Sequence, residues 1–366
     1  MTTQETATQV EARSQRVSTR VDVAILGVRV DAPVFRRAGA GPSDDGHVVL
    51  DGRATALPIN PASPYAIRGG RLLLDGADLG LDAEPVRRPR FYGLATADGV
   101  PYEQLARLHG RDVLATTVVQ TCIRYAEDQR CRFCAIEASL AAGSTTAVKS
   151  PAQLAEVAEA AVRLDGVRQM VMTTGTTNGR DRGARHLARC VRAVLDAVPG
   201  LPIQVQCEPP APEDLGVIGE LRDAGATAIG IHVESLDDRV RARWMPGKAT
   251  VALAQYGAAW DEAVRVFGRN RVSTYLLVGL GEDPDELVDG ALRLADRGVY
   301  PFVVPYRPLA GTLAMADGVG PPDPVVLERV TARVAAGLRA RGMAGADQGA
   351  GCAACGACSA LQAAGA

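Results

Sequence analysis

The chain has 366 residues, of which 47% are hydrophobic and 22% are charged, and its formal net charge is −2. This composition is that of an ordinary globular protein, and the charge argues against a nucleic-acid-binding protein, which needs a basic face. No apolar run reaches the length of a membrane span, so we expect neither a membrane nor a nucleic-acid partner.

The first hundred residues differ in pattern from the rest. Residues 1–20 are polar and lack the apolar centre of a secretory signal, so we expect a disordered leader. Residues 21–100 alternate β-type runs with Gly and Asp turns, which predicts a small β-rich N-terminal subdomain. The runs are Val21–Val30, His47–Leu50 and Arg71–Leu74.

A group of three cysteines follows a predicted short helix at Pro101–His109 and a predicted strand at Val113–Val119. Cys122, Cys131 and Cys134 form a C-x8-C-x2-C pattern. A [4Fe–4S] cluster is normally held by four cysteines, so three would leave one iron open to another ligand. A zinc site needs a fourth ligand, and the only nearby histidine is His109. Buried free thiols are the other alternative.

From residue 150 onwards, helical and strand patterns alternate. Ser150-Pro151 opens a helix that ends at Gly166, with Ser as the N-cap and Pro at the first position. We predict later helices at 181–197, 212–224, 236–244, 251–267, 283–297 and 323–342, and strands at 168–173, 202–207, 227–233, 271–279 and 300–305. Six strands alternating with helices predict parallel pairing with right-handed crossovers, in a partial barrel or a doubly wound open sheet.

A second group of cysteines lies near the C-terminus. Cys352, Cys355 and Cys358 form a C-x2-C-x2-C pattern among small residues, like the first three ligands of a ferredoxin sequence. We expect a second iron–sulfur cluster here, with zinc and free thiols as the alternatives. Cys207, Ser359 or a bound substrate would supply the missing ligand. With six of eight cysteines in two groups, we expect metal-bound thiolates in a reducing cytoplasm.

The first cysteine group, with Phe133 immediately before Cys134, resembles the cysteine loop of the radical SAM (S-adenosylmethionine) superfamily, although the usual spacing there is C-x3-C-x2-C. Val278-Gly-Leu-Gly-Glu282 is similar to a segment of its biotin-synthase-like branch. Over its whole length, the chain resembles a small bacterial family found in nitrilase-associated gene clusters, linked to nitrile or cyanide metabolism. The resemblance implies a partial (β/α)6 TIM-type barrel at 101–320, followed by a C-terminal helix and auxiliary-cluster tail at 321–366.

The resemblance also implies roles for residues where the predicted strands end. Cys122, Cys131 and Cys134 would hold the cluster whose open iron binds SAM. The residues that would bind SAM itself are Phe133, Thr173, Thr174, Gly175, Thr176, Glu234, Lys248, Gly279 and Gly281. Glu234 would accept hydrogen bonds from the ribose, and Lys248 would meet the SAM carboxylate unless it is a surface lysine.

Three further residues have both a functional and a structural interpretation. His232 would serve in acid–base chemistry or be a core histidine, and Arg307 would bind a substrate carboxylate or pair on the surface. Cys207 lies 27 residues before Glu234, the separation found in biotin synthase between a ligand of its second cluster and its ribose-binding acid. Val171 and Ser273 stand where the other cysteines of that cluster would be, so a second cluster of that type is not supported.

The resemblance implies an enzyme that cleaves SAM with its [4Fe–4S] cluster. The 5′-deoxyadenosyl radical so formed would abstract hydrogen from a small polar metabolite, and a flavodoxin or ferredoxin-type donor would supply the electron. One alternative is a sulfur-inserting enzyme, like biotin or lipoyl synthase, that consumes the auxiliary cluster. Another is a non-catalytic zinc-binding protein.

Overall fold

The computed structural model describes residues 7–31 and 47–365 of the chain. Its larger sheet places six parallel strands side by side in chain order, with a seventh strand antiparallel at one edge. These strands are β7 (Arg107–His109), β8 (Val113–Thr117), β9 (Gln169–Thr173), β10 (Ile203–Gln206), β11 (Ala228–Gly230), β12 (Val272–Val278) and β13 (Val299–Pro305). A doubly wound sheet reverses its strand order, whereas this one does not. The predicted α/β partial barrel is confirmed.

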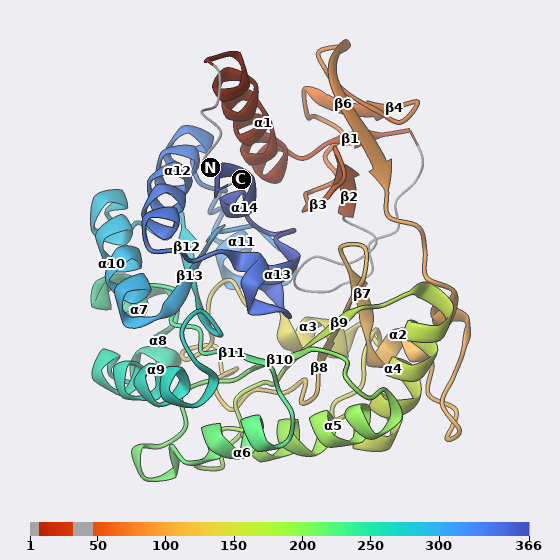
Figure 1. Cartoon of the computed structure of the whole chain (residues 1–366), viewed down its shortest axis with the longest axis vertical. Coiled ribbons are helices and arrows are strands. Elements are labelled where there is room, and N and C mark those ends of the chain that lie inside the picture. Colours follow the sequence, from red (N-terminus) through yellow and green to blue (C-terminus); the bar gives the residue numbers. More distant parts are fainter. Residues whose placement is uncertain (1–6, 32–46, 366) are drawn as a thin grey trace.

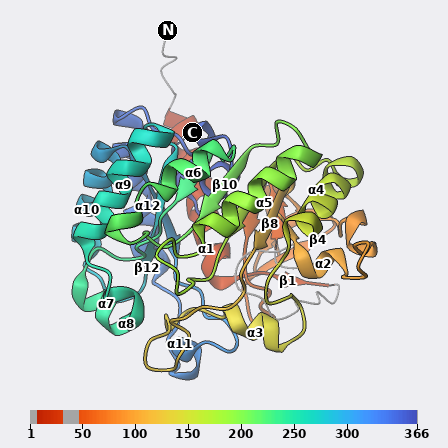
Figure 2. The ribbon, with the colours of Figure 1, turned by 90° about the horizontal axis from the view of Figure 1, so that it is seen from below.

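Helices cover the outer face of this sheet, as Figures 1 and 2 show. They are α4 (Pro151–Asp165), α5 (Ala184–Ala197), α6 (Val217–Asp223), α9 (Leu253–Phe267) and α10 (Pro284–Arg297). Crossovers of one hand between strands in sequential order place every helix on the same side of a sheet. In α4 the Ser150 hydroxyl accepts the N–H of Gln153, and Gly166 closes the helix at φ 69°, as predicted.

Short helices accompany the loops of the half-barrel. They are α2 (Tyr102–Leu105), α3 (Ile136–Ala141), α7 (Asp238–Trp244), α8 (Pro246–Ala249) and α11 (Leu313–Ala316). The helix predicted over Pro101–His109 is correct only in its first half, because Arg107–His109 pairs with β8 as strand β7. Tertiary pairing here overrides the local helical pattern.

A smaller six-stranded sheet comes from the N-terminal part of the chain, in the order β1-β4-β5-β6-β2-β3. Its strands are β1 (Arg29–Val30), β2 (His47–Leu50), β3 (Arg53–Ala56), β4 (Tyr65–Arg68), β5 (Arg71–Leu74) and β6 (Ala77–Pro85). All pairs are antiparallel except β1 with β4. The strands predicted at His47–Leu50 and Arg71–Leu74 are confirmed, whereas the limits of the subdomain stay a prediction.

The N-terminal prediction needs two corrections. Residues 7–20, expected in a disordered leader, belong to helix α1 (Ala7–Leu26), and residues 1–6 lie outside the described ranges. Most of the strand expected at Val21–Val30 is also helical. Val17, Val21 and Ile25 recur every fourth residue and are buried, because α1 packs on α12 (Pro324–Ala340) and the barrel core. Burial of one helical face outweighs the strand propensity of these β-branched residues.

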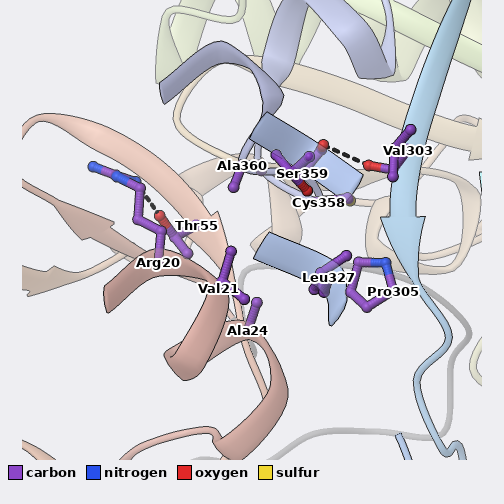
Figure 3. A pocket seen from close by; sticks show the side chains of 12 residues that line it. Arg20, Val21, Ala24, Thr55, Val303, Pro305, Leu327, Cys358, Ser359 and Ala360 are labelled. Atoms are coloured by element: carbon purple, nitrogen blue, oxygen red, sulfur yellow. Dashed lines mark hydrogen bonds between the residues drawn. The ribbon is translucent and has the colours of Figure 1, made fainter. Parts of the chain in front are cut away.

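The C-terminal segment spans the open side of the half-barrel, between its edge strands. It contains α13 (Cys352–Cys355) and α14 (Leu361–Gly365). Gly351 donates its N–H to Gln169 Oε1 at 2.8 Å, and the Ser359 hydroxyl donates to the Val303 carbonyl at 2.5 Å (Figure 3). The tail thus connects β9 with β13 across the half-barrel.

Over the described ranges, we find no helix that combines the length and the apolar character needed to cross a membrane.

Candidate functional site

The first cysteine group lies in the loop that leaves the carboxyl end of β8, where barrels of this kind carry their chemistry. The loop packs against the segment that follows β9. Gly175 donates its N–H to the Val119 carbonyl at 2.8 Å, and Ile123 donates to the Thr176 carbonyl at 2.9 Å. A Cβ on Gly175 would lie 2.1 Å from the Thr121 oxygen, so only glycine allows this approach.

The thiols of Cys131 and Cys134 interact with Cys122 and with the same charged groups, Lys248 and Glu234. Cys134 donates its N–H to the Cys131 carbonyl at 3.0 Å, which closes a turn between these two ligand candidates. Burial raises the pKa of both thiols, that of Cys134 to about 11, and each also feels the neighbouring Cys122. Lys248 acts in the opposite direction and favours their thiolates. The loop therefore gathers the three cysteines beside a positive charge.

Glu234 and Lys248 form an ion pair next to these thiols. Lys248 Nζ lies 3.0 Å from Glu234 Oε1, and the two side chains are only 16% and 11% exposed. Burial lowers the pKa of Lys248, but Glu234 and other neighbours raise it by more, so the lysine stays charged. Glu234 has a φ of 66°, a left-handed conformation that non-glycine residues rarely adopt outside functional sites. Lys248 is thus not a surface lysine.

A second buried ion pair fixes the cysteine loop to the end of β10. Arg124 Nε lies 3.0 Å from Glu208 Oε1, with 11% and 2% of the side chains exposed. Arg124 also donates to the carbonyl of Gly247, the residue before Lys248. The sequence analysis did not single out Arg124 or Glu208. The sequence nevertheless indicated both residues, because Glu208 directly follows a predicted strand and Arg124 lies inside the cysteine loop.

The glycine turn after β12 lies on the same side of the barrel. Glu282 accepts the N–H groups of Gly279 and Leu280, each at 2.7 Å, and so holds the turn. Gly279 and Gly281 have φ values of 106° and 94°, which favour glycine. The Trp244 indole donates to the Leu280 carbonyl at 2.5 Å, and its ring lies 6.5 Å from that of Phe133. Trp244 therefore connects this turn with the cysteine loop.

His232 lies two residues before Glu234, in the segment that follows β11. Its ring stacks on Tyr275 with centroids 4.1 Å apart, and its Nδ1 accepts the Tyr275 N–H at 3.2 Å. Burial, followed by the charge of Lys248, lowers the pKa of His232 to about 3, so the imidazole is neutral at physiological pH. Its Nε2 is buried without a hydrogen-bond partner among the described residues. A catalytic role for His232 stays a prediction.

The tail cysteines lie against the inner face of the half-barrel. Cys352 and Cys355 are three residues apart on α13, so they share one helix face, and both contact Val113, Ala115 and Val171. Burial raises the pKa of Cys355 to about 12, although the N–H of Ala357 bonds its sulfur. Cys358 lines a cavity of about 20 Å³ with Ser359 and residues of α1 and α12 (Figure 3).

Cys352 is also bonded by two side chains that the sequence analysis missed. The Tyr275 hydroxyl and Gln206 Nε2 both donate to its sulfur, the latter at 3.4 Å. The signal was available in Ile203-Gln-Val-Gln206, because central parallel strands are normally apolar on both faces. Polar residues at alternate positions in such a strand indicate a polar site on one face.

Three other predicted residues have clear structural surroundings. Cys207 follows Gln206 directly, so alternation along the strand directs its side chain away from the tail cysteines, and burial raises its pKa to about 12. Arg307 donates to the Ala56 carbonyl of β3 at 3.0 Å, which ties the barrel to the smaller sheet. Cys190 is fully buried on α5. The role of Cys207 as a cluster ligand stays a prediction, and so does the role of Arg307 in substrate binding.

Each of the two cysteine groups offers three thiols, the ligand type of iron–sulfur clusters. Within residues 7–31 and 47–365, no three His, Cys, Asp or Glu side chains lie close enough to bind one ion. A zinc site places four ligands around one atom, whereas cluster cysteines bind different irons and stand further apart. Cys131 and Cys134, which interact with Cys122 and with Lys248, supply thiol ligands of the kind that such a cluster uses.

Comparison with known proteins identifies the barrel. Residues 128–295, a little under half of the chain, match the family model described as the Radical SAM superfamily. The matched segment contains Cys131, Cys134, Glu234 and Lys248. A lipoyl synthase from Thermus thermophilus is 25% identical over 203 residues, which are 53% of this chain. The chain spans 58% of the length of that relative.

The comparison of this chain with solved structures concerns the fold alone. Methylornithine synthase has a TM-score of 0.48 at 16% identity, with 69% of this chain and 68% of that chain covered. The FeFe-hydrogenase maturase from Carboxydothermus hydrogenoformans has a TM-score of 0.46 at 17% identity, with 63% and 51% covered. These scores carry no inference about the site. The family model matches the central part of the barrel alone, and it names no substrate or reaction.

Proposed function

We propose that this protein is a radical SAM enzyme, which holds a [4Fe–4S] cluster on Cys122, Cys131 and Cys134 and uses SAM to abstract hydrogen from a small polar metabolite. One observation carries the proposal: Cys131 and Cys134, which also interact with Cys122, lie beside the buried Glu234–Lys248 ion pair at the carboxyl end of the half-barrel. When bound, the reduced cluster would supply the electron that cleaves SAM, and so start the reaction on the substrate.

The residues of the chain itself would orient SAM and exclude water. Lys248 is held charged by Glu234, so it can meet the SAM carboxylate, while the second oxygen of Glu234 is available to the ribose hydroxyls. Thr173, Thr174, Gly175 and Thr176 would receive the amino group, because they follow β9 beside the cysteine loop. Phe133 and the Gly279–Gly281 turn would enclose the adenine.

A second iron–sulfur centre on Cys352, Cys355 and Cys358 is part of the proposal. Support comes from the position of these cysteines on the inner face of the barrel, where the sulfur of Cys352 accepts two hydrogen bonds. The same feature favours a second candidate function, sulfur insertion at the expense of this centre. The similarity to a lipoyl synthase points in that direction.

The metabolic setting and the electron donor complete the proposal. The resemblance to a nitrilase-associated family is the reason to try metabolites of nitrile or cyanide metabolism first. A flavodoxin or ferredoxin-type protein would reduce the clusters, in a cytoplasmic compartment where thiolates stay reduced.

The test is an assay for 5′-deoxyadenosine by mass spectrometry on anaerobically reconstituted, dithionite-reduced protein given SAM. We expect product from the wild type and from Cys190→Ala, a buried cysteine outside both groups, and none from Cys122→Ala, Cys131→Ala or Cys134→Ala. Normal SAM cleavage in all three loop variants would contradict the cluster assignment. Protein that contains zinc instead of iron and is inert towards SAM would contradict the radical mechanism.

Sulfur insertion makes a separate prediction. With the true substrate, sulfide would be lost from the tail centre and sulfur would appear in the product after one turnover. A product without sulfur, formed over several turnovers, would favour hydrogen abstraction alone.

A further inference from the structure

Two polar side chains on the inner face of the half-barrel direct hydrogen-bond donors at one tail cysteine. The Tyr275 hydroxyl and Gln206 Nε2 both donate to Cys352 Sγ. We infer that Tyr275 and Gln206 are positioning residues that raise the reduction potential of an iron–sulfur centre held by Cys352, Cys355 and Cys358. The inference rests on the tail centre proposed above.

A chain of hydrogen bonds orients the Gln206 amide. Gln206 Nε2 also donates to Gln204 Oε1 at 2.8 Å, and Gln204 Oε1 accepts the N–H of Cys352 at 3.2 Å. Gln204 Nε2 in turn donates to Ser273 Oγ at 3.2 Å. Each amide therefore has one available orientation. A donor held in this way costs little reorganisation when charge appears on its acceptor.

Tyr275 is held by aromatic packing. Its ring stacks on His232 at 4.1 Å and lies 5.4 Å from the ring of Phe302 on the neighbouring strand. Cys352 and Cys358 are both among the groups that, after burial, raise the pKa of Tyr275. His232 is two residues before Glu234. One aromatic pair therefore connects the tail cysteines with the residues that would bind SAM.

The cost of this arrangement indicates a role beyond packing. Gln204 is fully buried and Gln206 is only 6% exposed, in a sheet whose other strands bury mostly apolar residues. Burying an amide costs free energy unless its hydrogen bonds are made, and an apolar pair would fill the same space without that cost. The amide donors reach a cysteine sulfur and its backbone, which are the groups that surround a cluster.

Electrostatics determines whether these hydrogen bonds raise or lower the reduction potential of the tail centre. Reduction adds negative charge to a cluster, and part of it resides on the cysteine sulfurs. Donors aimed at a sulfur stabilise the reduced state more than the oxidised state, which raises the potential. By contrast, Cys355 accepts a backbone N–H, which side-chain substitution leaves in place. Tyr275 and Gln206 are therefore the donors that mutation can remove one at a time.

The experiment isolates the tail centre in a Cys131→Ala protein, which lacks a ligand of the SAM cluster. Iron and sulfide content, the electron paramagnetic resonance spectrum and the midpoint potential are measured after anaerobic reconstitution. We expect Tyr275→Phe and Gln206→Leu to keep the iron content. Each should lower the equilibrium constant for one-electron reduction about tenfold, a shift of about 59 mV to lower potential.

A matched control is Tyr300→Phe, which makes the same chemical change at a buried tyrosine of β13 whose pKa shift comes from burial alone. It should leave the potential unchanged. An unchanged potential in both Tyr275→Phe and Gln206→Leu, at full iron content, would overturn the inference. Loss of iron from both variants would also overturn it, because Tyr275 and Gln206 would then be structural supports of the centre. If Cys131→Ala alone shows no cluster signal, the proposed tail centre fails instead.

Discussion

Replacing Gly175 by alanine tests how closely the cysteine loop packs against the segment after β9. The new Cβ would lie 2.1 Å from the Thr121 oxygen, and such contacts are not seen below 3.0 Å, so the loop must retreat by about 0.9 Å, the difference between the two. Thr121 immediately precedes Cys122. We therefore expect this substitution to displace a cluster ligand without touching any cysteine.

The cost can be worked out from the contacts that the retreat breaks. These are the hydrogen bonds from Gly175 to Val119, at 2.8 Å, and from Ile123 to Thr176, at 2.9 Å. Each contributes about 0.5–1.5 kcal/mol, so about 1–3 kcal/mol is lost. The smaller backbone entropy of alanine in the unfolded chain returns about 0.4–1 kcal/mol. The net destabilisation is about 0–2.6 kcal/mol, with a central value of about 1.3 kcal/mol, concentrated in the loop.

The assay compares iron bound per chain, 5′-deoxyadenosine formation and the thermal midpoint with those of Gly219→Ala. Gly219 lies in helix α6 with open space around its Cβ position, so alanine there should stabilise the protein by about 0.5–1 kcal/mol. We expect Gly175→Ala to lose most iron and SAM cleavage with a small fall in midpoint. Wild-type iron content and activity in Gly175→Ala would refute the reasoning.

Three further predictions concern single side chains. Lys248→Met leaves Glu234 buried and unpaired, so we expect this variant to bind SAM more weakly in calorimetry and to be destabilised by about 3–5 kcal/mol. The double variant Lys248→Met/Glu234→Leu should regain stability but not SAM binding. Burial, with a smaller effect of Arg107, lowers the pKa of Lys149 from 10.5 to about 7. Between these two pH values Lys149 is protonated in the unfolded chain but not in the folded one. The free energy of unfolding therefore rises with pH in this window, by up to about 1.4 kcal/mol per pH unit. Lys149→Met should lose that rise in denaturant titrations from pH 7 to 10, and parallel curves for the two proteins would contradict the shift. Cys190→Ala should keep full iron content and cost about 1 kcal/mol of stability, and iron loss would show that this cysteine is a ligand.

The sequence determined the features that depend on short spacings and local periodicity. Alternating helix and strand patterns predicted the parallel sheet, and Ser150, Pro151 and Gly166 marked both ends of α4 correctly. The cysteine spacings and the glycine turn after β12 located the candidate site, because ligands three residues apart and residues with positive φ leave a direct trace in the sequence.

The tertiary structure decided what depends on contacts between distant segments. Helix α1 forms because Val21 and Ile25 are buried on the barrel core, a contact that the polar composition of residues 1–20 does not indicate. Tyr275 and Gln206 can donate hydrogen bonds to Cys352 only because the folded tail brings this cysteine next to β10 and β12. Likewise, the burial of Lys248 depends on its ion pair with Glu234, which lies before helix α7 whereas Lys248 lies after it. Such contacts join residues far apart in the chain, and their energies arise only after the strands have assembled, so no local pattern predicts them.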